Sequence, residues 1–285
     1  GMRLKMAIIT FLKNQKEETG KTLSIAAIAT YMSIDHNSKH LIVTTSGADE
    51  RMKRCFWKEK KKSKMSFGIF GPNKNNIFEQ QNGINGLAKV TKSNKITPDV
   101  ITNYTRVIFK DRLEVLLGPE QSDRDDIVKL YPDILTVANQ YYERIFVDLD
   151  NNVPEETANK IINMSDIIVV NLNQRLSSIE DFRQKKEEKQ ELKSAKILLL
   201  IGRYDRYSKY NIKNITRYLG ERNNILTIPY NTLFFEAAEE AGVPDLFLRF
   251  KKFMDPDDRN AFFVEEVKRA SENIIYRIQN VQKGQ

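Results

Sequence analysis

Gly20, Lys21 and Thr22 carry the clearest chemistry in this sequence. They follow an apolar run, residues 6–12, and a polar segment, residues 13–19, and a helical pattern begins at Lys21. A lysine ammonium, a threonine hydroxyl and the free backbone N–H groups at the start of a helix together bind phosphate and its magnesium ion. The spacing therefore predicts a phosphate-binding loop between a first strand and a first helix.

Two glutamates, Glu17 and Glu18, stand where such loops usually carry glycine. Glycine permits unusual φ angles and lets the backbone approach a phosphate closely. A carboxylate near a triphosphate would repel it by about 1–4 kcal/mol, depending on screening. The sequence leaves open whether these two side chains point away from the bound anion or into its site.

The elements that must position this loop are short strands and helices that alternate along the chain. Strand patterns occupy residues 6–12, 40–45, 112–117, 144–149, 166–172, 195–201 and 225–228. Helical patterns occupy residues 21–33, 84–92, 97–109, 123–142, 154–164, 209–219, 231–240, 243–253 and 259–280, and a charged helix ends near residue 190. Several strands are apolar on both faces, which is typical of a parallel sheet covered by helices on both sides. We therefore expect a three-layer α/β fold with a mostly parallel sheet, and ligands at the carboxyl ends of its strands.

Length and composition limit the class of protein. No Pro-, Gly- or Ser-rich linker divides the 285 residues, so we expect a single domain over 1–285. No apolar run reaches the roughly 20 residues that span a bilayer. Cys55 is the single cysteine, which excludes an internal disulfide and favours a cytoplasmic location. The helix at 259–280 carries mixed rather than basic charges, which favours docking on the body over membrane binding.

A basic segment covers residues 51–64. Eight of its residues are Lys or Arg and one is Glu, whereas the whole chain has a net charge of +8. Such a cluster attracts anionic partners, either nucleic acid (DNA or RNA) or an anionic membrane. A solvated surface loop is the alternative, with Phe56 and Trp57 anchoring it on the body. His36 and His40 have no acidic or cysteine neighbours at metal-ligand spacing, so we interpret both as structural.

Several segments resemble one family. Residues 14–22 (NQKEETGKT) resemble the deviant Walker A loop of the ParA/MinD-type ATPases, which reads NQKGGxGKT. Residues 142–148 resemble the Walker B strand, and residues 195–205 resemble the strand that ends in an Asn-Arg-Tyr-Asp type of turn. Residues 228–242 are similar to the family's IPxD…EAxxxG segment, and residues 83–118 to its Flp-pilus branch (CpaE/TadZ-like). The resemblance covers nearly the whole chain and implies the fold of a P-loop NTPase.

The resemblance also implies ATP and Mg²⁺ as cofactors, with a role for each loop residue. Lys21 would reach the β- and γ-phosphates, and Thr22 would hold Mg²⁺ through its hydroxyl. Gly20, with Thr19 before it, would offer backbone N–H groups at the start of the helix. Asp148, at the end of the Walker B strand, would orient Mg²⁺ through water.

Besides Glu17 and Glu18, two positions depart from the family pattern. The strand at 40–45 ends in Thr44-Thr45-Ser46, where the family has an aspartate that positions the attacking water. Hydroxyl groups of Thr and Ser are not basic near neutral pH, so they cannot replace it as a general base. Gly202 stands where the family has an asparagine that reads adenine. We therefore expect weak hydrolysis of ATP or none.

Three functions stay open. In the first, the protein is an ATP-binding switch that regulates position or assembly, in pilus or secretion assembly, in the cytoplasm or at the inner membrane. Lys16 would then reach across a homodimer, and Lys16 and Asp148 would be its catalytic residues. In the second, a degenerate family member docks protein partners without nucleotide. In the third, residues 51–64 bind nucleic acid without sequence specificity.

Overall fold

The computed structural model describes residues 6–46, 50–58, 83–119, 124–221, 225–252 and 255–284. Its strands are β1 (Ala7–Lys13), β2 (His40–Thr44), β3 (Arg106–Phe109), β4 (Leu113–Leu116), β5 (Arg144–Asp148), β6 (Ile167–Leu172), β7 (Ile197–Tyr204) and β8 (Leu226–Pro229). They form one eight-stranded sheet in the order β3-β4-β2-β5-β1-β6-β7-β8. β3 pairs with β4 in antiparallel orientation, and every other pairing in the sheet is parallel. The predicted mostly parallel sheet is confirmed.

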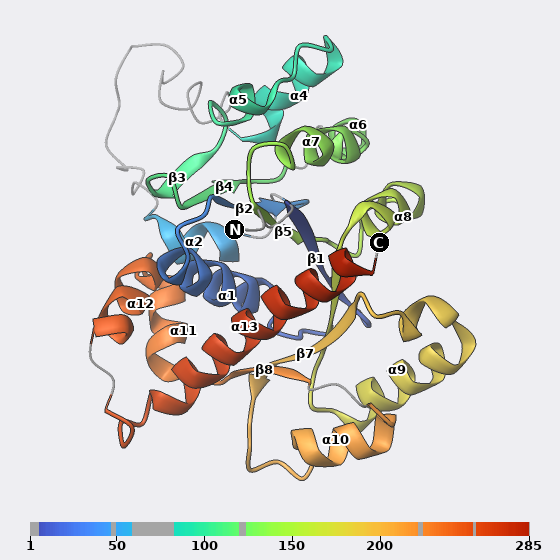
Figure 1. Cartoon of the computed structure of the whole chain (residues 1–285), viewed down its shortest axis with the longest axis vertical. Helices are drawn as coiled ribbons and strands as arrows, with labels where there is room; N and C mark the ends of the chain where they lie inside the picture. The colour runs from blue at the N-terminus through green and yellow to red at the C-terminus, as the bar shows by residue number, and fades with distance from the viewer. Residues whose placement is uncertain are drawn as a thin grey trace, which may run out of the picture.

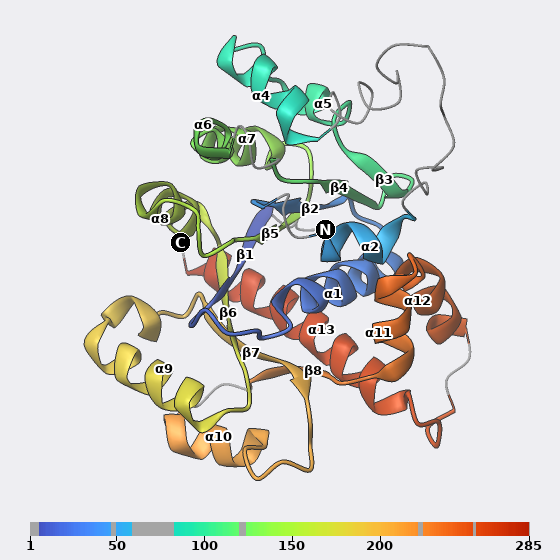
Figure 2. The same cartoon turned by 180° about the vertical axis from the view of Figure 1, so that it is seen from behind.

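Helices cover both faces of the sheet (Figures 1 and 2). One face carries α1 (Lys21–Asp35), α2 (Arg51–Phe56), α11 (Thr232–Glu239), α12 (Val243–Lys252) and α13 (Ala261–Lys283). The other carries α4 (Ile84–Lys92), α5 (Pro98–Ile101), α6 (Arg124–Val128), α7 (Tyr131–Ala138), α8 (Glu155–Met164), α9 (Leu176–Glu188) and α10 (Ile212–Leu219), with a short 3₁₀ turn, η2 (Gln190–Lys193), after α9. This is the predicted three-layer architecture.

The central strand β1 shows why these strands are apolar on both faces. Ile9 and Phe11 are buried in the cluster that contains Ile25 of α1, whereas Ile8 is buried in the cluster on the opposite face. Burying one such side chain stabilises the fold by about 1.5–3 kcal/mol. A strand buried on both faces therefore keeps apolar side chains at successive positions.

The long helix predicted over 97–109 is wrong. Thr97-Pro98-Asp99 does start a helix, but α5 ends at Ile101, and Arg106–Phe109 form the edge strand β3. Asp111 has φ 60°, in the left-handed region, which reverses the chain between β3 and β4. Arg106–Phe109 pair with β4. Contacts between the side chains of two paired strands favour the extended conformation of this segment over a continuation of α5.

The segment at 51–64 also differs from its predicted loop. Residues 51–56 form α2, because Met52, Cys55 and Phe56 lie on one helical face and are buried against the body. Trp57 packs beside them, with the Arg106 guanidinium 4.5 Å from its ring centroid. The anchoring role predicted for the two aromatic residues is confirmed. Residues 59–64, which hold most of the lysines, lie outside the described residues.

The last helix, α13, packs against α1 and β8, as predicted for residues 259–280. Phe263, Val267 and Ile274 form its buried face. Within the described part of the chain, no helix combines the length and the apolar character that crossing a membrane requires.

His40 is fully buried at the start of β2, which confirms its structural interpretation. Its Nε2 lies 3.1 Å from Arg144 Nη1, and its Nδ1 lies 3.0 Å from the Arg112 carbonyl oxygen. A guanidinium can only donate, so Nε2 accepts and Nδ1 carries the proton. Burial, followed by the charge of Arg144, lowers the pKa of His40 from 6.5 to about 3.

The neutral state of His40 makes stability depend on pH. Unfolded chains take up a proton on this imidazole below pH 6.5, and the folded protein does not until about pH 3, so stability falls as pH falls through this window. At pH 5 this one group should cost about 2 kcal/mol of unfolding free energy. Denaturant unfolding at pH 7.5 and pH 5 measures the loss. His40→Gln should be less stable at pH 7.5 and should lose about 2 kcal/mol less between the two pH values. An equal loss in both proteins would contradict this account.

Candidate functional site

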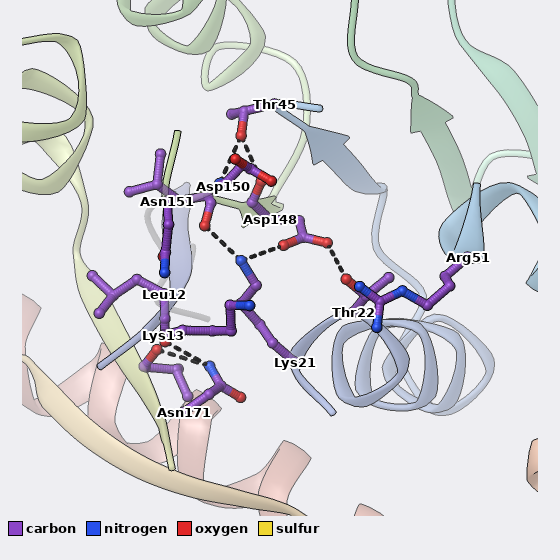
Figure 3. A network of polar contacts seen from close by, with 12 residues as sticks. Leu12, Lys13, Lys21, Thr22, Thr45, Arg51, Asp148, Asp150, Asn151 and Asn171 are labelled. Carbon is purple, nitrogen blue, oxygen red and sulfur yellow. Dashed lines mark hydrogen bonds and ion pairs between the residues drawn. The ribbon is translucent and has the colours of Figure 1, made fainter. Parts of the chain in front are cut away.

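The structure brings Lys21, Thr22 and Asp148 together at the carboxyl end of the sheet (Figure 3). Lys21 Nζ lies 2.9 Å from Asp148 Oδ1 and donates to the Leu149 carbonyl oxygen at 2.5 Å. Thr22 Oγ1 donates to the other carboxylate oxygen, Asp148 Oδ2, at 2.8 Å. The exposed fractions of the three residues are 7, 7 and 8%, respectively. Both oxygens of one buried carboxylate are therefore engaged by the loop.

Strand register places these side chains. β1 and β5 are parallel neighbours, and Phe11 of β1 is paired with Asp148 of β5. The chain leaves β1 after Lys13 and turns into α1 at Lys21. The first turn of α1 therefore lies beside the end of β5.

The start of α1 has the features of an anion site. Gly20 precedes the helix with φ 74°, which glycine adopts without strain. Among the side chains that the structure describes, none caps this helix start, and its first turn holds no acidic residue. Its backbone N–H groups and the helix dipole therefore favour a bound anion. Thr19 is buried beside it, and within the described structure its hydroxyl has no hydrogen-bond partner.

Glu17 and Glu18 point to opposite sides of the loop. Glu17 Oε2 lies 3.3 Å from Arg175 Nη1 and accepts a hydrogen bond from Asn173 Nδ2 at 3.2 Å. Glu18 Oε2 accepts from Arg51 Nη1 at 2.6 Å, and this hydrogen bond lowers the pKa of Glu18 below its ordinary value. The question that the sequence left open therefore has two answers. Glu17 turns away, whereas Glu18 lies on the wall of the pocket beside Lys21.

That pocket, here called the loop pocket, lies between residues 14–22 and the ends of β2 and β5. Its charged walls are Lys13, Glu18, Lys21, Arg51, Asp148 and Asp150. A water-sized sphere can enter about 40 Å³ of it, which is room for about three water molecules. Three cations face three carboxylates, so the charges of the walls balance.

Three of these residues were missed by the sequence analysis as site residues. Arg51 was assigned to the basic segment at 51–64, and Lys13 to the polar segment that follows the first strand. Asp150 follows the Walker B-like strand and lies 3.2 Å from Arg124 Nη2. Their shared position depends on the register of three strands, for which the sequence contains no local pattern.

The donor set fits Mg²⁺ only when a phosphate is present. Thr22 and Asp148 offer a hydroxyl and a carboxylate oxygen, which are hard ligands of the kind that Mg²⁺ takes. In the described part of the chain, no group of three or more His, Cys, Asp or Glu side chains could hold a metal ion. In nucleotide sites, Mg²⁺ is held by one or two protein oxygens together with phosphate oxygens and water.

Solved structures share this architecture. A ParA family ATPase from Chlorobium tepidum TLS matches with a TM-score of 0.64 and 13% identity, over 96% of this chain and 98% of that chain. MinD of Pyrococcus horikoshii OT3, a septum site-determining protein complexed with Mg-ADP, matches with a TM-score of 0.62 and 14% identity, over 95% and 98% of the two chains. This chain has the fold of the ParA and MinD ATPases.

A plasmid partition protein of Borrelia burgdorferi B31 bound to AMPPNP has the same fold. It matches with a TM-score of 0.55 and 14% identity, over 98% of this chain and 99% of that chain. No protein-family profile matches the sequence, and no curated protein is similar to it in sequence. The likeness to ParA and MinD structures is therefore one of fold, at low sequence identity.

The structure also places Lys16 and the threonines at the end of β2. Lys16 is exposed, and its carbonyl oxygen accepts a hydrogen bond from Lys13 Nζ at 3.3 Å; its side chain stays outside the Lys21 network. Thr44 Oγ1 accepts from the Gly118 N–H, and Thr45 Oγ1 donates to the Asp148 carbonyl oxygen. These hydroxyls tie β2 to its neighbours.

Gly202 is required by packing. A Cβ atom at this position would lie 2.3 Å from the Thr19 carbonyl oxygen and 3.2 Å from Gly20 Cα. β7 therefore approaches the loop too closely for any side chain at 202. An asparagine side chain, as in the family pattern, would have no room at this position.

Gly202→Ala should displace the loop and destabilise the protein by about 2 kcal/mol or more, because backbone atoms must move to admit the methyl group. Denaturant unfolding measures the cost. Gly242→Ala is the matched control, because its added Cβ would meet its nearest neighbours at an ordinary 3.4 Å. Equal stability of the two variants would show that the close approach of β7 is not a constraint.

Proposed function

We propose that this protein binds ATP with Mg²⁺ at residues 14–22 and works as a ParA/MinD-like nucleotide switch with weak hydrolysis or none. The observation that carries the proposal is the network of Lys21, Thr22 and Asp148 at the uncapped start of α1. It combines an ammonium group, a hydroxyl and a carboxylate where parallel strands end, which is where α/β sheets bind ligands.

Each group has a distinct task when nucleotide binds. Lys21 would bind phosphate oxygens in place of Asp148 and the Leu149 carbonyl oxygen, and the first N–H groups of α1 would bind the same anion. Thr22 would hold Mg²⁺ through its hydroxyl, and Asp148 would orient Mg²⁺ through water. The metal ion supplies positive charge that neutralises the phosphates. Thr19 and Gly20 shape the backbone around them.

Weak or absent hydrolysis follows from the side chains at the end of β2. Thr44 and Thr45 engage their hydroxyls with Gly118 and with the backbone of Asp148 and Asp150. A hydroxyl is not a general base near neutral pH, and these hydroxyls are already committed. Asp49, the first aspartate after β2 in the sequence, lies outside the described residues.

The presence of bound nucleotide would act on other proteins through dimerisation. We propose a homodimer in which Lys16, exposed beside the site, reaches the partner's nucleotide and acts with Asp148 as a catalytic residue. The MinD and partition proteins with this fold are seen with Mg-ADP and AMPPNP, which supports the nucleotide. We also propose a role in pilus or secretion assembly, in the cytoplasm or at the inner membrane. This proposal rests on the resemblance of residues 83–118 to the Flp-pilus branch (CpaE/TadZ-like) of the family.

A second candidate function is a docking scaffold that binds no nucleotide. The loop pocket favours it in one respect, because only about 40 Å³ admits water and its charges already balance. Binding of a triphosphate then requires Lys21 and Glu18 to move. Binding of nucleic acid through residues 51–64 stays a prediction, since residues 59–64 lie outside the described part of the chain.

Nucleotide binding should raise the melting temperature of the protein. At an ATP concentration about 100 times the Kd, with Mg²⁺, the stabilisation is about 2.7 kcal/mol, which is a shift of several degrees for a chain of this size. Lys21→Ala should abolish the shift, measured against the melting temperature of the same variant without ATP. Lys16→Ala should retain the shift in melting temperature that comes from nucleotide binding to a single monomer, because Lys16 is proposed to contact only the partner's nucleotide. If millimolar Mg-ATP leaves the wild-type melting temperature unchanged, the scaffold function is favoured.

A further inference from the structure

Arg51 brings a cation to the loop pocket from outside the phosphate-binding loop. It is the first residue of α2, and its Nη1 lies 2.6 Å from Glu18 Oε2. Arg51 and Glu18 both line the pocket that contains Lys21 and Thr22. The side chains of Arg51 and Glu18 are 33 and 53% exposed, so solvent and solutes reach the pair.

The backbone that carries Arg51 is held firmly. Met52, Cys55 and Phe56 are buried, and α2 packs against α1, α11 and α12. The Cα of Arg51 therefore stays at the rim of the pocket, from where its long side chain can reach a ligand that enters. A guanidinium presents planar pairs of N–H donors that match the oxygens of a phosphate, which is why arginine is favoured wherever phosphate is recognised.

Glu18 holds this guanidinium in the way a phosphate would. Its carboxylate is a single negative charge with two acceptor oxygens, and it lies at the pocket wall rather than in the core. Exposed ion pairs contribute little stability, about 0–1 kcal/mol. A phosphate group, with more charge and more acceptor oxygens, can therefore displace it.

The two glutamates of the loop differ in this respect. Glu17 pairs with Arg175 across the opposite side of the loop, and neither residue lines the loop pocket. The Glu17–Arg175 pair is therefore a glutamate–arginine ion pair outside the loop pocket, with which the Glu18–Arg51 pair can be compared.

Resting on the proposed function, we propose that Arg51 is a phosphate-binding residue and that Glu18 occupies it until a phosphate of the Mg-nucleotide enters the loop pocket. Glu18 then acts as an internal competitor of the ligand, and its effect on affinity depends on Arg51. A carboxylate that only repelled phosphate would act whether or not Arg51 is present.

A double-mutant cycle separates these two roles of Glu18. Mg-ATP affinity is measured by calorimetric titration for wild type, Glu18→Gln, Arg51→Ala and the double variant, with thermal unfolding confirming that each is folded. Arg51→Ala should weaken binding by about tenfold or more, since a charge-assisted hydrogen bond is lost. Glu18→Gln should strengthen binding more in the wild-type background than in the Arg51→Ala background, where the substitution removes only the repulsion between the carboxylate and the phosphate.

The control is Arg175→Ala, which removes the ion pair with Glu17 outside the loop pocket and should bind Mg-ATP like wild type. An equal gain from Glu18→Gln with and without Arg51, or an unchanged affinity in Arg51→Ala, would overturn the role of Arg51 and leave the proposed function standing. Absence of Mg-ATP binding in wild type and in all variants would overturn both.

Discussion

A buried ammonium group must be compensated by an anion or by carbonyl oxygens, and the ammonium of Lys21 is the group around which this edge of the sheet is arranged. Asp148 and the Leu149 carbonyl oxygen compensate it, at 2.9 and 2.5 Å. Removing one partner of a buried charge pair is strongly destabilising. Any ligand that takes Lys21 from Asp148 therefore has to be anionic and has to leave Asp148 a new positive partner. A phosphate with its magnesium ion meets both requirements.

The sheet supplies the geometry that this pair requires. Asp148 ends β5, between Phe11 of β1 and Thr44 of β2 in register. Parallel pairing brings the carboxyl ends of these strands to one edge, and helices on both faces keep the strands between them apolar. On the other side, β7 approaches the loop so closely that Gly202 leaves no space for a side chain. The loop is therefore packed against the end of β5 on one side and against β7 on the other. The side that faces the loop pocket is lined by Glu18 and Arg51.

Local patterns predicted the sheet and the phosphate-binding loop at Gly20, Lys21 and Thr22, because each strand has its own apolar run and the loop follows the first of them. The place of Asp148 near Lys21 was predicted by the resemblance of residues 142–148 to a Walker B strand. The helix over 97–109 failed because pairing with β4 turned Arg106–Phe109 into a strand, which local propensity does not report.

Features that depend on distant partners could not be predicted. Glu17 is 158 residues from Arg175, and Glu18 is 33 residues from Arg51, so their directions depend on the folded chain. Arg51 begins a basic run and was read with it. In the structure, the apolar face of α2 packs on the body and leaves Arg51 at the pocket. The need for glycine at 202 likewise depends on the contact between β7 and the loop.

The most direct measurement of the central claim is a crystal structure of the protein with Mg²⁺ and a non-hydrolysable ATP analogue. The account predicts a phosphate oxygen within hydrogen-bonding distance of Lys21 Nζ, with Asp148 and Thr22 turned to the metal ion. A structure at saturating ligand in which Lys21 still contacts Asp148, with the nucleotide elsewhere or not bound, would contradict it.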